Sequence, residues 1–155
     1  RISGPPDRWH HEVRNSRYHA LMASLFSRIV AGEIPCYKVQ ENEKFLAFLD
    51  LNPLRKGHTL VIPKTEVDYI FDIDDSTLAE MIVFAKVVSK KIRTVFPCRK
   101  IGMTVIGLEV PHAHIHLVPL QRMDDLNFSN PRLSFTEEEY QNLAAEISAA
   151  FSAVR

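Results

Sequence analysis

The sequence lacks the features that mark secreted, membrane-spanning or nucleic-acid-binding chains. Its 155 residues include only two cysteines, Cys36 and Cys98, which are too few for a disulfide framework and favour a reducing compartment, the cytoplasm. Net charge is zero, because nineteen Lys and Arg balance nineteen Asp and Glu, so we expect no nucleic-acid partner. No apolar run approaches the roughly 18 residues of a membrane span, so we expect no membrane partner.

The first 21 residues also lack the apolar stretch of a signal peptide. They carry charges throughout and are followed by Met22. We expect residues 1–21 to be an expression-derived leader, with a natural disordered arm as the alternative. The remaining residues, 22–155, have room for one domain with a C-terminal helix and are too few for two domains of ordinary size.

Hydrophobic periodicity predicts short strands between helices. Helices are expected over residues 24–31, 74–95 and from 136 onward, and strands over 37–40, 45–50, 58–62, 101–106 and 112–118. Two capping boxes are predicted, Thr77 with Glu80 and Thr136 with Glu139. Short links between strands require antiparallel pairing. We therefore expect an α+β fold, a single domain in which helices pack against one five-stranded antiparallel sheet.

Three histidines alternate with apolar residues at positions 112, 114 and 116. On a strand, alternate side chains point to the same face, so His112, His114 and His116 would lie about 7 Å apart, close enough to surround one phosphate. The apolar residues between them would point into the core.

This row has three interpretations. It could be a solvated strand face that happens to carry histidine, or a zinc site, although no Asp or Glu lies within the row. It could also catalyse phosphoryl or nucleotidyl transfer, because a neutral imidazole, with a pKa near 6.5, can attack phosphorus while its neighbours donate hydrogen bonds to the oxygens. We favour transfer, since three histidines in five positions rarely arise on an ordinary strand face.

The row resembles the H-φ-H-φ-H-φ-φ signature of the histidine-triad (HIT) nucleotide hydrolases and transferases, closest to the histidine-triad nucleotide-binding (Hint-like) branch. The resemblance runs from about Leu25 to Pro119, and includes a helix ending in Gly-Glu-Ile-Pro and the segments 48–50 and 57–63. It implies a hydrolase that cleaves purine nucleoside monophosphates from phosphoramidate-type substrates through a covalent nucleotidyl-histidine intermediate. Alternatives are a dinucleoside polyphosphate hydrolase and a nucleotide- or metal-binding regulatory module with little turnover.

The resemblance also implies roles for individual residues. His114 matches the nucleophile, whereas His112 and His116 match residues that orient it, bind phosphate oxygens and assist the leaving group. His58 matches a fourth histidine that lines the pocket, and Asp50 matches the carboxylate that binds the ribose hydroxyls. The candidates for the base slot and the phosphate approach are Leu25, Phe26, Ile29, Phe48, Leu51, Gly107 and Val110.

The approach to the row departs from the family pattern. The stretch from Met103 to Gly107 is shorter than in the family and contains no Asn, Leu108 stands in place of Gln, and Glu109 stands in place of Ser or Thr. A carboxylate repels an anionic substrate unless it is protonated or acts on a cationic amine leaving group, so Glu109 either faces away or alters substrate choice. Ser24 and Ser27 occupy the places of a Cys-x-x-Cys zinc pair, and we expect no metal and no cofactor.

The resemblance further implies a homodimer that pairs through the long helix and an edge strand, with a small-molecule nucleotide as substrate. The polar segment from 122 to 132 is expected to be an ordered loop near the site.

Overall fold

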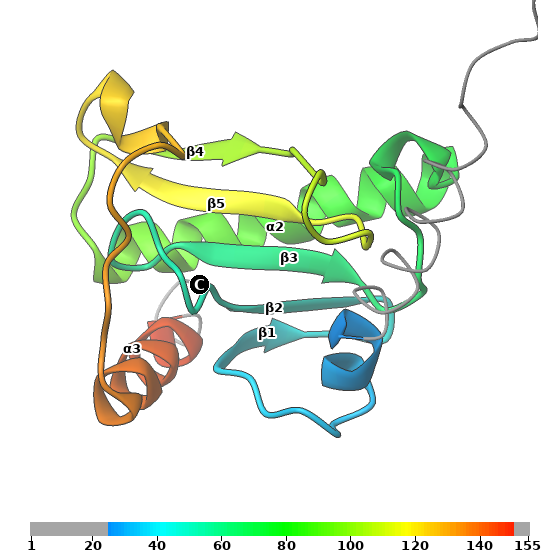
Figure 1. The fold of residues 1–155 in the computed structure, drawn as a ribbon, viewed down its shortest axis with the longest axis horizontal. Helices are drawn as coiled ribbons and strands as arrows, with labels where there is room; N and C mark the ends of the chain where they lie inside the picture. Colours follow the sequence, from blue (N-terminus) through cyan, green and yellow to red (C-terminus); the bar gives the residue numbers. More distant parts are fainter. Residues whose placement is uncertain (1–24, 151–155) are drawn as a thin grey trace, which may run out of the picture.

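Five short strands form one antiparallel sheet in the order β1-β2-β3-β5-β4 (Figure 1). The strands are β1 (Lys38–Glu41), β2 (Phe45–Leu49), β3 (Thr59–Pro63), β4 (Lys100–Thr104) and β5 (Ile115–Leu120). This computed structural model describes residues 25–150, so the expected leader over residues 1–21 lies outside the described residues. The predicted α+β fold with a five-stranded antiparallel sheet is confirmed.

Helices cover both faces of this sheet. Helix α2 (Asp75–Val95) runs behind it and α3 (Glu137–Ala150) lies beside β1, whereas a short helix over residues 25–30 lies in front (Figure 1). Two 3-10 turns, η1 (Ile70–Asp72) and η2 (Met123–Leu126), complete the elements. Among residues 25–150, no helix is long and apolar enough to cross a membrane.

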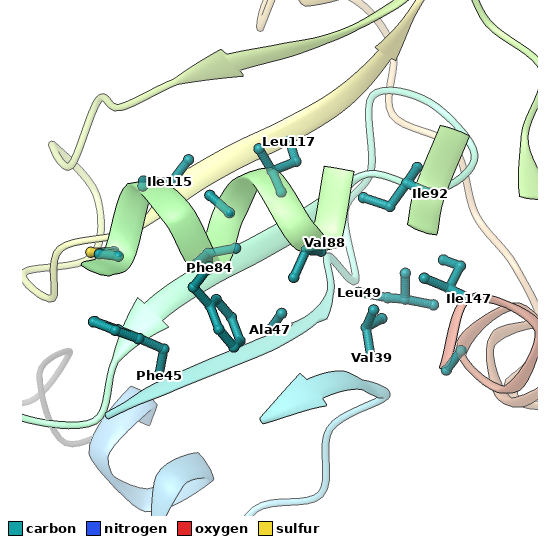
Figure 2. Packing of buried hydrophobic residues seen from close by; sticks show 14 of the residues in the cluster. Val39, Phe45, Ala47, Leu49, Phe84, Val88, Ile92, Ile115, Leu117 and Ile147 are labelled. Carbon is teal, nitrogen blue, oxygen red and sulfur yellow. The ribbon is translucent and has the colours of Figure 1, made fainter. Parts of the chain in front are cut away.

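Alternate residues of β2 and β3 divide between two apolar clusters. On β2, Phe45, Ala47 and Leu49 join the larger cluster, into which α2 and α3 pack their apolar faces (Figure 2). Leu46 and Phe48 join the second cluster, on the face covered by the first helix. All five positions of β2 are buried, and each large side chain among them contributes about 1.5–3 kcal/mol by leaving water. The sheet is therefore covered on both faces.

The two predicted capping boxes have different outcomes. The box at Thr136 and Glu139 is confirmed, because the Thr136 amide donates to the Glu139 carboxylate at 2.7 Å and the Glu139 amide donates to Thr136 Oγ1 at 3.2 Å. The box at Thr77 and Glu80 is wrong. Asp74 caps α2 instead, with its carboxylate accepting from the Thr77 amide at 3.1 Å, and Glu80 pairs with a lysine before β2. The Asp74 carboxylate, one turn before Thr77, thus accepts from the amide that Glu80 was expected to satisfy.

The strand predicted over 112–118 begins later, at Ile115. Pairing between β3 and β5 starts at Val61 and Ile115, so His112 and His114 precede the ladder and only His116 lies within it. The expected alternation nevertheless holds, because the apolar residues at 113, 115 and 117 all belong to the larger core cluster. The histidines thus point away from α2.

Candidate active site

A cavity of about 470 Å³ opens on the sheet face that carries the first helix. Eleven of the thirteen residues selected from the sequence line it: Leu25, Phe26, Ile29, Phe48, Asp50, Leu51, Gly107, Glu109, Val110, His114 and His116. His58 and His112 are buried behind this lining. Segments distant in sequence therefore meet at one site.

His114 is held in one orientation and one tautomer. Its Nδ1 lies 2.7 Å from the carbonyl oxygen of His112, and a carbonyl can only accept, so the ring proton is on Nδ1. In the neutral ring the opposite nitrogen, Nε2, then carries the lone pair. The Phe26 ring packs against His114 with 5.5 Å between centroids. In that tautomer the ring that lines the cavity has one nitrogen with a free lone pair.

His58 and His116 form a directed hydrogen-bonded pair behind the cavity. The Leu54 amide donates to Nδ1 of His58 at 3.0 Å, which places the His58 proton on Nε2. That nitrogen lies 3.0 Å from Nδ1 of His116 and 3.4 Å from Oδ2 of Asp50. His116 Nδ1 is therefore the acceptor, and the neutral His116 ring carries its proton on Nε2.

Burial keeps this pair uncharged. It lowers the pKa of His58 to about 4, and the nearby Arg132 and His114 act in the same direction. It lowers the pKa of His116 to about 3, again assisted by His114 and His58 and opposed by Asp50. At neutral pH both rings are thus neutral, so the hydrogen-bond direction from Leu54 through His58 to His116 is maintained.

His112 supports the site from inside the protein. Its Nε2 lies 2.7 Å from the Pro63 carbonyl oxygen, so its proton is on Nε2, and the buried Nδ1 has no hydrogen-bond partner among the described residues. Burial lowers the pKa of His112. The cavity is therefore lined by two of the three rings, and the third contributes its backbone carbonyl to the orientation of His114.

Asp50, His58 and His116 form the one cluster, within residues 25–150, whose ligand atoms lie close enough to hold a metal ion, all within 4.8 Å of one another. The tautomer opposes this use. Nδ1 of His58 accepts from Leu54, so Nε2 bears a proton and has no lone pair for a metal. The donor set fits a hydrogen-bond chain better than a metal centre.

Asp50 is held from three sides at the end of β2. Its amide donates to the His58 carbonyl oxygen at 3.0 Å, and its own carbonyl oxygen accepts from the Tyr140 hydroxyl at 3.1 Å. Oδ1 accepts from the Asn52 amide at 2.8 Å. The carboxylate therefore has a defined position beside the cavity, with Oδ2 near the His58–His116 pair.

The loop before the histidine row turns at Gly107, whose φ of 69° lies in the left-handed region that glycine adopts most readily. The loop brings Leu108, Glu109 and Val110 to the cavity. Glu109 therefore lines the cavity. The sequence left open whether Glu109 faces away from the site or alters substrate choice, and this placement favours the second possibility.

The cavity lining also includes residues that were not selected from the sequence, and two of them, Phe128 and Arg132, lie close to the histidines or carry a charge. The Phe128 ring lies 4.9 Å from the His116 ring and 6.3 Å from the His58 ring, and the Arg132 guanidinium lies 5.1 Å from the Phe128 centroid. Both belong to the segment between η2 and α3. The sequence predicted an ordered loop near the site, but its only signal there was the Asn130-Pro131 turn, which selects neither residue.

The sequence and the fold of this chain are similar to those of known proteins. The model of the HIT domain family matches residues 31–123. An adenosine 5'-monophosphoramidase of Schizosaccharomyces pombe is 33% identical over 130 residues, which cover 83% of this chain and 98% of that protein. A solved structure of a hypothetical histidine triad nucleotide-binding protein from Sulfolobus tokodaii has a TM-score of 0.71 and 31% identity, covering 83% of this chain and 92% of that chain. A zinc-bound histidine triad family protein from Mycobacterium smegmatis has a TM-score of 0.69 and 31% identity, covering 84% and 96%.

Proposed function

The chain belongs to the HIT domain family, and from that membership we propose that it is a hydrolase of the purine nucleoside phosphoramidase type. It would cleave a nucleoside monophosphate from an amine or similar leaving group. The observation that carries the proposal is the orientation of His114, whose Nδ1 lies 2.7 Å from the His112 carbonyl oxygen, so that in the neutral ring the lone pair is on Nε2 of a side chain that lines the cavity. Membership of the family and the name of the Schizosaccharomyces pombe relative support a nucleotide hydrolase.

The cavity suits a nucleoside monophosphate in two parts. The base would lie in an apolar slot between the first helix and β2, lined by Leu25, Phe26, Ile29, Phe48 and Leu51. The Asp50 carboxylate would accept hydrogen bonds from both ribose hydroxyls. This would place the phosphate near His114, His116 and the loop from Gly107 to Val110, where a glycine allows close approach of backbone amides.

The reaction would proceed in two displacements. His114 Nε2 attacks the α-phosphorus, the bond to the leaving nitrogen breaks, and that nitrogen takes up one proton from water in the cavity. Water then attacks phosphorus, the bond to Nε2 breaks, and one proton returns to solvent. The Nε2–H of His116 would donate to an oxygen that gains charge in each transition state. His58 would hold His116 in that tautomer, and His112 would orient the nucleophile.

Glu109 would favour a cationic or amine leaving group. Its side chain is exposed and lines the same cavity as His114. A carboxylate there attracts a developing ammonium and repels an anion. This preference would distinguish phosphoramidates from dinucleoside polyphosphates, which are the alternative substrates within the family.

The test is hydrolysis of an adenosine phosphoramidate and of a dinucleoside polyphosphate by the wild type, His114→Ala and Glu109→Ser. We expect the wild type to prefer the phosphoramidate over the dinucleoside polyphosphate. His114→Ala should lose at least about a thousandfold in kcat. Glu109→Ser should reduce the preference for the phosphoramidate. If the wild type binds nucleotide but turns over neither substrate, the chain is a binding module instead. Full activity of His114→Ala would assign the nucleophile elsewhere.

We propose in addition that the chain forms a homodimer through α2 and β4. Strand β4 is an open edge of the sheet, and Met103 on it is 52% exposed, while Val83 on α2 is 61% exposed. Exposed apolar residues on an open edge invite pairing with a second copy. Light scattering should give a dimer for the wild type and for Met123→Glu, a control with another exposed methionine, and a monomer for Met103→Glu. A monomeric wild type contradicts the proposal.

A cytoplasmic location is the remaining part of the proposal. Cys36 and Cys98 are both free thiols, a state that a reducing compartment preserves. Cell fractionation of the tagged chain should recover it with cytoplasmic markers, and recovery in an oxidising compartment would contradict this.

A further inference from the structure

The cavity contains one cation that the proposed reaction does not use. Three charged residues other than histidine line it, and Asp50 and Glu109 are acidic. Arg132 is the only Lys or Arg among the lining residues that the structure describes. It lies in the segment between η2 and α3 and is half-buried. Of the residues from 25 to 150, it is therefore the one that would present a fixed positive charge to a substrate bound in the cavity.

The guanidinium of Arg132 is held by neutral partners. Nη1 donates to the Asn52 carbonyl oxygen at 3.0 Å and Nη2 to the Phe128 carbonyl oxygen at 3.5 Å, and the group stacks on the Phe128 ring. By contrast, Arg55 pairs with the carboxylate of Asp125 at 3.2 Å. No carboxylate within residues 25–150 forms an ion pair with Arg132.

Arg132 is thus a positioned donor that has no counter-charge in the described part of the chain. A guanidinium has five N–H groups in a rigid fork, and two of them are occupied by the carbonyl oxygens of Asn52 and Phe128. The remaining N–H groups can bind an oxyanion in charge-assisted hydrogen bonds, and because the side chain is already held, little rotamer entropy is lost on binding.

The position of Arg132 indicates which part of a substrate it would meet. Its supporting ring, Phe128, lies against His116, and its charge acts on both His58 and His116. A phosphate on the ribose would face the Asp50 carboxylate, which repels it. Besides the α-phosphate itself, the anion that Arg132 can bind without this repulsion is one carried by the leaving group.

We propose that Arg132 is a specificity residue that binds a carboxylate or phosphate on the leaving group of the substrate. This inference rests on the proposed phosphoramidase function and deepens it. Glu109 lines the same cavity and would attract an amine. The two residues together would therefore favour a leaving group that combines an amine with an anionic group. Two sources have this chemistry, an amino acid with a free carboxylate and an amine that bears a phosphate.

Two matched pairs of adenosine phosphoramidates distinguish these sources. The carboxylate pair is the conjugate of glycine and the conjugate of glycine methyl ester. The phosphate pair is the conjugate of aminoethyl phosphate and the conjugate of ethanolamine. For each pair the ratio of kcat/KM values, charged over uncharged, is measured for the wild type, Arg132→Gln, Arg132→Lys and Arg122→Gln. Arg122 is an exposed arginine outside the cavity and serves as the control.

We expect the wild type to prefer the charged member of at least one pair by about tenfold. Arg132→Gln should bring that ratio close to one, Arg132→Lys should retain part of it, and Arg122→Gln should retain all of it. Because each ratio compares two substrates on one preparation, any loss of folded protein cancels. The pair that shows the effect identifies the source.

Three results would overturn the proposal. An unchanged ratio in Arg132→Gln would overturn it, and if both members of each pair also lost activity equally, Arg132 would act on the nucleotide or on the fold. Equal turnover of both members by the wild type would overturn this inference alone. If the wild type hydrolyses none of the four conjugates, the proposed function itself fails and this inference fails with it.

Discussion

Acidification is expected to destabilise this fold because two buried histidines resist protonation. Burial lowers the pKa of His58 to about 4 and that of His116 to about 3, whereas both return to about 6.5 in an unfolded chain. Between these values the unfolded chain binds more protons than the folded chain, so the free energy of unfolding falls as the pH falls. This contribution is fully present above about pH 6.5 and is lost progressively down to about pH 3.

The size of the effect follows from the two shifts. Each unit of pKa difference corresponds to about 1.36 kcal/mol. A pH of 5 lies about 1.5 units below the pKa of the imidazole in the unfolded chain, whereas neither buried ring is yet protonated in the folded chain. Each histidine therefore lowers the free energy of unfolding by about 2 kcal/mol. His58 and His116 share one hydrogen bond, so their contributions are not independent. We expect a total loss of about 2–4 kcal/mol between pH 7 and pH 5.

Urea unfolding at pH 7 and pH 5, at one ionic strength, measures this loss. The control is His58→Asn, in which an amide oxygen can still accept from the Leu54 amide but the side chain does not titrate. Its stability should fall by about 2 kcal/mol less than that of the wild type over the same interval. Equal losses in the two proteins, or a wild-type midpoint that does not move, would refute the buried neutral pair.

Two further predictions concern the supports of the site. Alanine at Gly57, where φ is +92° and a Cβ would lie 2.6 Å from the Phe96 ring, should lower stability by more than about 2 kcal/mol, whereas alanine at Gly107, where a Cβ meets nothing within 4 Å, should cost only about 1 kcal/mol; equal melting temperatures would contradict this contrast. Tyr140→Phe removes the bond to the Asp50 carbonyl oxygen, and we expect a loss of about 1 kcal/mol with a raised KM for nucleotide. An unchanged KM would show that α3 does not position Asp50.

The histidine row could be recognised from the sequence because its signal is local. Side chains alternate on any extended chain, so the prediction that the histidines share one face holds at His112 and His114 even though the strand itself begins at Ile115. Periodicity does not reveal depth, however. His112 is fully buried, and His58 lies behind His116 where a place on the cavity wall was expected.

The other differences between the sequence predictions and the structure have two causes. Some depend on contacts between residues far apart in the sequence, and others arise where two neighbouring residues fit the same local pattern. Phe128 and Arg132 reach the cavity from a loop with no periodic pattern, and the bond from Arg132 to Asn52 joins residues 80 positions apart, which no local rule predicts. The cap of α2 shows the second case. Asp74 and Thr77 are both good capping residues, and the sequence alone did not select Asp74.

The central claim is that His114 carries the nucleotide during turnover. Rapid quenching of the reaction with a phosphoramidate labelled at the α-phosphorus tests it most directly. We predict label on the peptide that contains His114, stable in alkali and lost in acid as a phosphorus–nitrogen bond to imidazole requires, and absent from His114→Ala. Turnover with no protein-bound label at any quench time, or label on a different residue, would contradict the account.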